Sequence, residues 1–79
     1  MKYFELTISW NVENGIQLAY AYVFARCKTE AQRLVLSKIP YEAELSDFAE
    51  HPASAYKYTD KVKLWFFDKD KAEHREEYA

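Results

Sequence analysis

The side chains that could support catalysis or hold a metal ion are few and widely spaced in this sequence. His51, His74 and Cys27 are its only imidazole and thiol groups, and no Cys-X-X-Cys or His-Glu-X-X-His pattern brings such groups to ligand spacing. Gly15 is the single glycine, so no glycine-rich loop is available to hold a phosphate. We therefore expect no enzyme activity, no metal site and no cofactor.

Cys27 is the one candidate nucleophile, and it is followed by Lys28. Nucleophilic catalysis needs a base beside the thiol, and the sequence nominates neither histidine for that role. We expect Cys27 to be a small buried side chain instead. A single cysteine also allows no intrachain disulfide, which favours a cytoplasmic protein.

Carboxylates gather between residues 39 and 56, a stretch without lysine or arginine. If residues 41–50 form a helix, these side chains make either a solvated face or an acidic patch for a partner. The four acidic residues are Glu42, Glu44, Asp47 and Glu50.

The size and composition predict a single domain over residues 1–79. Seven Tyr, five Phe and two Trp give this short chain enough bulk for one core. No stretch approaches the roughly 20 apolar residues of a membrane span. The charged tail, residues 68–79, is expected to be a frayed helix or disordered.

An opening β-hairpin is the most specific structural signal. Residues 2–10 alternate between apolar and polar side chains, and Asn14-Gly15 is typical of a two-residue type I′ turn. That turn predicts cross-strand pairs whose numbers sum to 29. One face then carries Phe4 opposite Ala25, Leu6 opposite Val23, Ile8 opposite Ala21 and Trp10 opposite Ala19, a surface on which a helix can pack.

The helix is expected to begin at Thr29, an N-cap with Gln32 three residues later, and to end before Pro40. For residues 41–50 we expect a second short helix, with a strand through Tyr41, Ala43 and Leu45 as the alternative. Residues 55–68 are expected to form a second hairpin that turns at Asp60-Lys61, with Val62, Leu64 and Phe66 toward the helices. The fold class is α+β: a two-layer arrangement of two β-hairpins in an antiparallel sheet, with one or two helices on one face (ββααββ).

The other sheet face would be aromatic, and exposed aromatic patches usually mark an interface. The alternative is that C-terminal residues cover this face, or that its tyrosines lie at the edge of the core with their hydroxyls exposed to solvent. Three partners would suit an exposed face: another protein, single-stranded nucleic acid, or a second copy of the chain. The net charge of −2 makes nucleic acid the less favoured of these. The residues on this face are Tyr20, Tyr22, Phe24, Tyr56, Tyr58 and Trp65.

Three segments carry a resemblance in size and layout to a known class: the strand at residues 2–6 (KYFEL), the capped helix at 29–34 (TEAQRL) and the late strand with its charged exit at 63–70 (KLWFFDKD). The layout is similar to that of small phage-encoded anti-CRISPR proteins of the type I inhibitor class. The resemblance implies a protein of the host-cell cytoplasm that binds a CRISPR-Cas surveillance complex and blocks target DNA binding or nuclease recruitment. In that setting the acidic patch would contact lysines and arginines that otherwise hold DNA.

Overall fold

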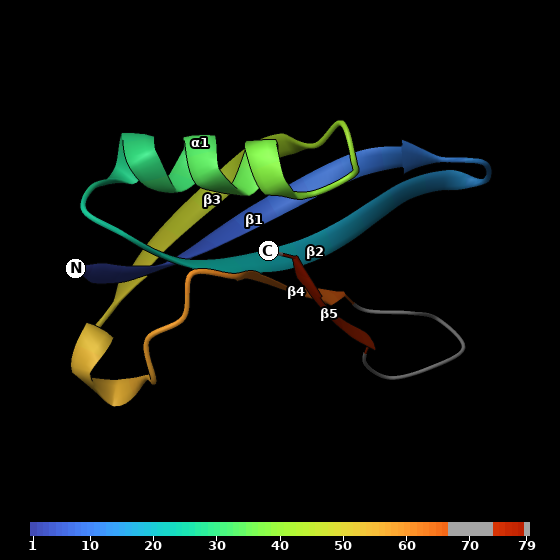
Figure 1. Cartoon of the computed structure of the whole chain (residues 1–79). Helices are drawn as coiled ribbons and strands as arrows, with labels where there is room; N and C mark the ends of the chain where they lie inside the picture. The colour runs from blue at the N-terminus through green and yellow to red at the C-terminus, as the bar shows by residue number, and fades with distance from the viewer. Residues whose placement is uncertain (67–73, 79) are drawn as a thin grey trace.

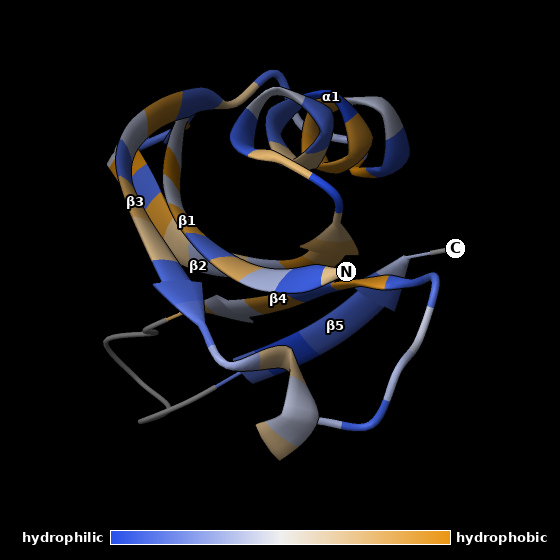
Figure 2. Cartoon of the chain, turned by 90° about the vertical axis from the view of Figure 1, so that its left-hand side faces the viewer, coloured by the Kyte–Doolittle hydropathy of each residue, from blue (hydrophilic) through white to orange (hydrophobic). Residues whose placement is uncertain are grey.

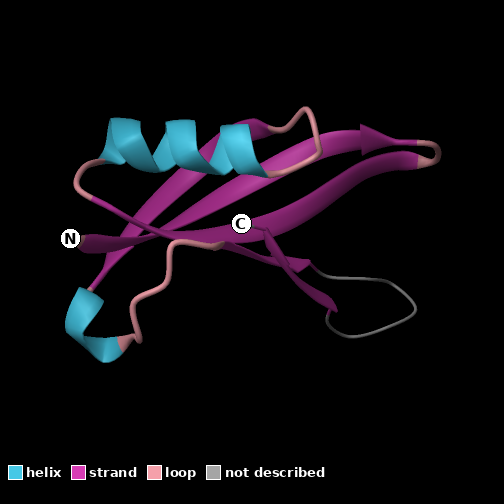
Figure 3. Cartoon of the chain, in the orientation of Figure 1, coloured by secondary structure: helices cyan, strands magenta, loops and turns pink. Residues whose placement is uncertain are grey.

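The computed structural model describes residues 1–66 and 74–78, and within them it shows an α+β fold with one antiparallel sheet of five strands (Figure 1). The strands are β1 (Lys2–Val12), β2 (Gly15–Ala25), β3 (Glu44–His51), β4 (Val62–Phe66) and β5 (His74–Tyr78). Their order across the sheet is β3-β1-β2-β4-β5. The helix α1 (Lys28–Lys38) lies on one face, and the short 3-10 helix η1 (Ala53–Ala55) lies on the opposite side (Figure 3). We call the side of the sheet toward α1 the helix face and the opposite side the outer face.

The opening hairpin is present, but its register differs from the expected one. Val12 pairs with Gly15, so the turn residues are Glu13 and Asn14 and the cross-strand numbers sum to 27 instead of 29. Among the described residues only Gly15 has a positive φ, +143°, which rules out the type I′ turn, since that turn needs two such residues. The register moves by two residues, an even number, so each side chain stays on its predicted face.

The helix face is packed as the alternation predicted. Leu6, Ile8 and Ala21 are completely buried, and α1 places Ala31 and Val35 against them. Small side chains on β2 let the helix approach the sheet closely. Figure 2 shows the sheet curling upward around α1 at β3, which encloses this core.

The start of α1 is two residues earlier than expected, because Cys27 and not Thr29 is its N-cap. Glu30 closes this end by accepting hydrogen bonds from the Arg26 backbone N–H (3.2 Å) and the Arg26 Nε (2.9 Å). A carboxylate in the first turn also interacts favourably with the helix dipole. The prediction that Cys27 is buried was wrong: as a cap residue at the helix entrance it is exposed.

Residues 44–51 form the edge strand β3, and the predicted second helix at 41–50 was wrong. The alternative of a strand was nearer, although β3 begins only at Glu44. The misleading signal was the three-residue spacing of Leu45 and Phe48, which looks helical. A bulge opposite Thr7 and Ile8 brings Leu45 beside Ile8 and Phe48 beside Leu6, so both side chains reach the core from a strand.

The second hairpin was also placed wrongly. Residues 56–61 are a loop and not a strand, so no hairpin turns at Asp60-Lys61. β4 pairs instead with β2 on one side and with β5 on the other. Its Val62, Leu64 and Phe66 are buried, as predicted.

The prediction of a frayed or disordered tail was wrong for residues 74–78, which form β5. The rest of that prediction lies outside the described residues. Within the part of the chain that the structure describes, no helix is long and apolar enough to cross a membrane.

Candidate binding groove on the outer face

The aromatic residues of β2 lie on the outer face, as the alternation predicted. Tyr20 pairs across the sheet with Trp65 of β4, and Tyr22 pairs with Glu5 and Lys63. Their neighbours along β2, the alanines and Val23, point to the opposite side and fill the core.

One end of this face is covered by the segment that follows β3. Tyr3 is the centre of the contact: its ring lies 4.3 Å from that of Tyr56 and 4.5 Å from that of Phe24. The Phe24 ring in turn meets the edge of Tyr58 at 5.3 Å. Phe24 is consequently only 7% exposed, so its predicted place on an open surface was wrong, whereas Tyr56 and Tyr58 remain about half exposed.

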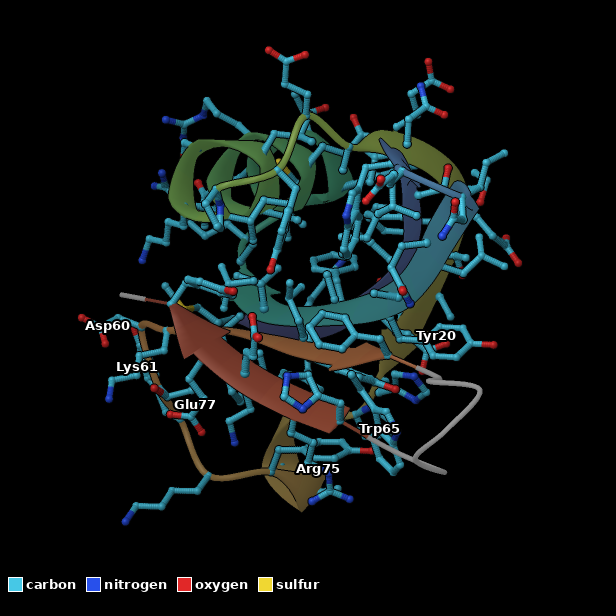
Figure 4. All side chains as sticks on the ribbon, turned by 90° about the vertical axis from the view of Figure 1, so that its right-hand side faces the viewer. Tyr20, Asp60, Lys61, Trp65, Arg75 and Glu77 are labelled. Atoms are coloured by element: carbon cyan, nitrogen blue, oxygen red, sulfur yellow. The ribbon has the colours of Figure 1, made fainter. Side chains whose placement is uncertain are left out.

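Beside this covered end the outer face is hollowed into a groove of about 380 Å³, which we call the aromatic groove. Its floor comes from β1, β2 and β4, and Tyr56 and β5 form its walls. Figure 4 shows Trp65 of β4 with Arg75 and Glu77 of β5 on the side of the sheet away from α1. The lining residues are Tyr3, Tyr22, Tyr56, Lys63, Leu64, Trp65, Arg75, Glu76 and Glu77.

Charged groups of both signs line the rim of the aromatic groove. The Arg75 guanidinium lies over the Trp65 ring, 4.2 Å from its centroid, a cation–π contact. Lys63 pairs across the strands with Glu77, whose Oε2 is also 3.8 Å from the Lys61 Nζ. The rim is therefore polar and nearly balanced in charge around an aromatic floor, which is the anatomy of a protein-binding surface.

Tyr22 is held in place through its hydroxyl. Burial raises the pKa of Tyr22, and its hydrogen bond to the Glu5 carboxylate raises it further. Burial likewise raises the pKa of Tyr3, with a smaller contribution from Tyr56. Both phenols therefore stay neutral at physiological pH. In the floor of the groove Tyr22 is a hydrogen-bonded group, and Tyr3 is a stacking group that contacts the rings of Tyr22 and Tyr56.

The acidic patch does not join this groove. Its residues lie on or just before β3, at the far edge of the sheet from β5, and all four are exposed. Glu44 and Asp47 pair with Ser9 and Thr7, while Glu50 lies 3.6 Å from the Lys2 Nζ. The two surfaces that the sequence nominated are thus separate, and the acidic one belongs to a strand edge and not to a helix.

Six of the nine residues that line the groove were not among the predicted site residues, and Tyr3 and Arg75 are the two whose rings or charges contribute most to its shape. Tyr3 could have been placed on the outer face by the alternation along residues 2–10, which puts it on the opposite side from Phe4 and Leu6. Arg75 belongs to a five-residue strand whose sequence, HREEY, alternates too weakly to suggest a strand. No sequence signal could have located it.

A second cluster, on the helix face of β5, is built around Glu76. Its carboxylate accepts hydrogen bonds from the Tyr78 hydroxyl and the Tyr41 hydroxyl, and its Oε1 lies 2.9 Å from His74 Nε2. Tyr41 also stacks on Trp10 at 4.2 Å, so the cluster connects β5 to the loop after α1 and to β1.

A smaller hollow of about 270 Å³ lies beside the Glu76 cluster, lined by Trp10, Val12, Gln17, Tyr41, Phe66 and His74. Among the described residues no group of three His, Cys, Asp or Glu side chains could hold a metal ion.

The Glu76 cluster makes a testable prediction about pH. The hydrogen bond from Tyr78, and next that from His74, hold the pKa of Glu76 below its ordinary value of 4.5. A carboxylate whose pKa is lowered by folding stabilises the protein at pH values above its ordinary pKa. This stabilisation is lost as the pH falls through the pKa of the folded state. We expect Glu76→Gln to be less stable than the native protein at about pH 7, and the difference to shrink below about pH 4.5. Urea unfolding across this range measures it, with Glu13→Gln in the exposed turn as the control; a difference independent of pH would contradict the role of Glu76.

No family model, curated protein or solved structure matches this chain. Its function is therefore inferred from its own residues.

Proposed function

We propose that this chain is a non-enzymatic binding protein that holds a protein partner in the aromatic groove. The observation that supports the proposal is the groove itself: Tyr22, Tyr56 and Trp65 line a hollow of about 380 Å³ on a sheet face that α1 leaves uncovered. Tyrosine and tryptophan are the residue types that most often dominate protein-binding energetics, because their rings are large and rigid.

A protein suits this surface better than a nucleic acid does. Stacking of bases on an aromatic sheet requires cations along the face to hold the phosphates. Here Glu77 lies among the cations of the rim, and Glu5 is bound to Tyr22 beside the floor. These carboxylates would repel a phosphate backbone, whereas they are ordinary components of the polar rim of a protein interface.

The resemblance in layout to type I anti-CRISPR proteins suggests which partner to test. The proposed partner is a CRISPR-Cas surveillance or effector complex, held so that target DNA binding or nuclease recruitment is blocked. The separate acidic patch on β3 would then be available to the DNA-binding lysines and arginines of the same complex, while the aromatic groove contributes the affinity.

The test of the groove is co-migration of the purified chain with surveillance complexes of several type I subtypes in size-exclusion chromatography. We expect Trp65→Ala and Tyr56→Ala each to weaken the complex by at least about 30-fold, as hot-spot truncations do. Leu36→Ala is the matched control, because Leu36 is as exposed as Tyr56 but lies on α1. If both groove variants bind as tightly as the control, the groove is not the interface.

Two other outcomes would redirect the proposal. Failure of the chain to co-migrate with any subtype contradicts the CRISPR partner, and steep loss of oligonucleotide binding with added salt would identify a nucleic-acid partner instead. Changing Glu42, Glu44, Asp47 and Glu50 together to Gln or Asn tests the acidic patch alone. If that variant inhibits as well as the native chain does, the acidic patch is not part of the interface, and the proposal then rests on the groove alone.

A further inference from the structure

The outer edge of β5 carries backbone groups that the proposed function does not use. β5 is the last strand of the sheet, and no described residue pairs with its outer edge. Such an edge presents backbone N–H and C=O groups that can pair with a strand of another chain. Figure 4 shows β5 at the front of the molecule, with β4 behind it and α1 above.

The side chains of β5 restrict how a second copy could pair with it. His74, Glu76 and Tyr78 pair with the buried residues of β4 and therefore belong to the helix face, whereas Arg75 and Glu77 pair with Trp65 and Lys63 and belong to the outer face. A twofold axis perpendicular to the sheet keeps the two faces apart, so each residue must meet one from its own face. One such register pairs the whole of β5: Glu76 opposite Glu76, Arg75 opposite Glu77, and His74 opposite Tyr78.

The charges favour this register over its neighbours. It brings the Arg75 guanidinium opposite the Glu77 carboxylate of the second copy, and the symmetry makes this contact twice. A register displaced by two residues in either direction would instead oppose two Arg75 side chains or two Glu77 side chains, which is unfavourable. The one like-charge contact in the favoured register is between the two Glu76 carboxylates, and each of these is already hydrogen-bonded within its own copy by Tyr78 and Tyr41.

The other edge of the sheet lacks this self-complementarity. β3 carries Glu44, Asp47 and Glu50 and no lysine or arginine. Two such edges would repel each other, a common protection of edge strands against pairing. Of the two edges of the described sheet, only that of β5 has charges of both signs in a self-matching order.

We infer that two copies of this chain associate through β5 into a twofold dimer with one continuous sheet. The dimer joins the two outer faces at Arg75 and Glu77, so the two aromatic grooves lie on the same side of one extended surface. The inference does not depend on the proposed partner, because it rests on backbone pairing and charge order at β5 alone.

The experiment is sedimentation velocity of the full chain from about 10 μM to about 1 mM, the range in which weak interfaces associate. We expect a concentration-dependent dimer, and we expect Arg75→Glu and Glu77→Arg each to weaken it about tenfold. An equimolar mixture of the two variants should regain native association, since the carboxylates of one variant then meet the guanidinium groups of the other. Lys57→Glu and Glu13→Arg are the charge-matched controls away from β5 and should dimerise normally.

Three results would overturn the inference: a monomer at all concentrations, variants that associate as the native chain does, or a mixture that does not regain association. If a variant fails to fold, amide hydrogen exchange of the native chain replaces it. Exchange at residues 74–78 should be slower at the higher concentration, and equal rates at both concentrations would overturn the dimer.

Discussion

Leu6→Ala is expected to lower the free energy of unfolding by about 3 kcal/mol. Leu6 lies at the middle of β1, completely buried, with Ala21 of β2 on one side and Phe48 of β3 on the other. Truncating it removes apolar area from the core and leaves a cavity that the rigid sheet cannot close. A domain of this size is stable by roughly 4–12 kcal/mol, so this single change removes a large part of the total. Urea unfolding followed by far-ultraviolet circular dichroism measures the loss.

The matched control is Leu18→Ala, the same change in the same hairpin. Leu18 lies on the outer face and is 54% exposed, so we expect a loss of no more than about 0.5 kcal/mol. The comparison tests which face of the hairpin lies under α1. Equal losses from the two variants would contradict the assignment of faces.

That assignment could be made from the sequence because it depends only on alternation along a strand. The turn was placed wrongly, and each cross-strand pair moved by two residues, yet Phe4, Leu6 and Ile8 still face the helix. The identity of a face has a period of two, so an even error in register leaves it unchanged. The stripe of Ala31 and Val35 on α1, which Ile39 continues at the C-cap, was predictable for the same kind of reason, since it repeats along one regular element.

The errors arose where local spacing and tertiary pairing disagree. Leu45 and Phe48 are three residues apart, a helical spacing, but β1 offers an unpaired edge and the bulge lets both side chains enter the core from a strand. β5 has no apolar alternation of its own, and β4 supplies its pairing. Because Arg75 and Glu77 depend on β5 for their positions, one wall of the aromatic groove could not be predicted from the sequence. The outer-face positions of Tyr22 and Trp65 in its floor were predictable from alternation, although the pairing of β2 with β4 was not.

Tyr3→Ala is the second change with a large expected effect, about 3 kcal/mol of lost stability. Tyr3 is 6% exposed, and its ring contacts those of Tyr22, Phe24 and Tyr56. Removing the ring opens a cavity on the outer face and also takes away the surface on which Tyr56 stacks. We therefore expect faster amide exchange in residues 53–58 as well as a lower midpoint in urea. Tyr3→Phe keeps the ring and should cost about 0.5 kcal/mol or less.

The Tyr3 variants also separate the two interpretations of the aromatic face. If residues 53–58 only cover the core edge, Tyr3→Ala lowers stability, while Tyr56→Ala, which removes a half-exposed ring, changes partner binding no more than Leu36→Ala does. If the aromatic groove binds a partner, Tyr56→Ala weakens binding at nearly native stability and Tyr3→Phe weakens neither. Among the described ring contacts, Tyr56 is connected to the sheet only by its stacking on Tyr3 and its edge contact with His51. A Tyr3→Ala protein with native stability and native amide exchange at residues 53–58 would therefore contradict both interpretations. The stacking of Tyr56 on Tyr3 thus makes the shape of the groove dependent on one buried ring of β1.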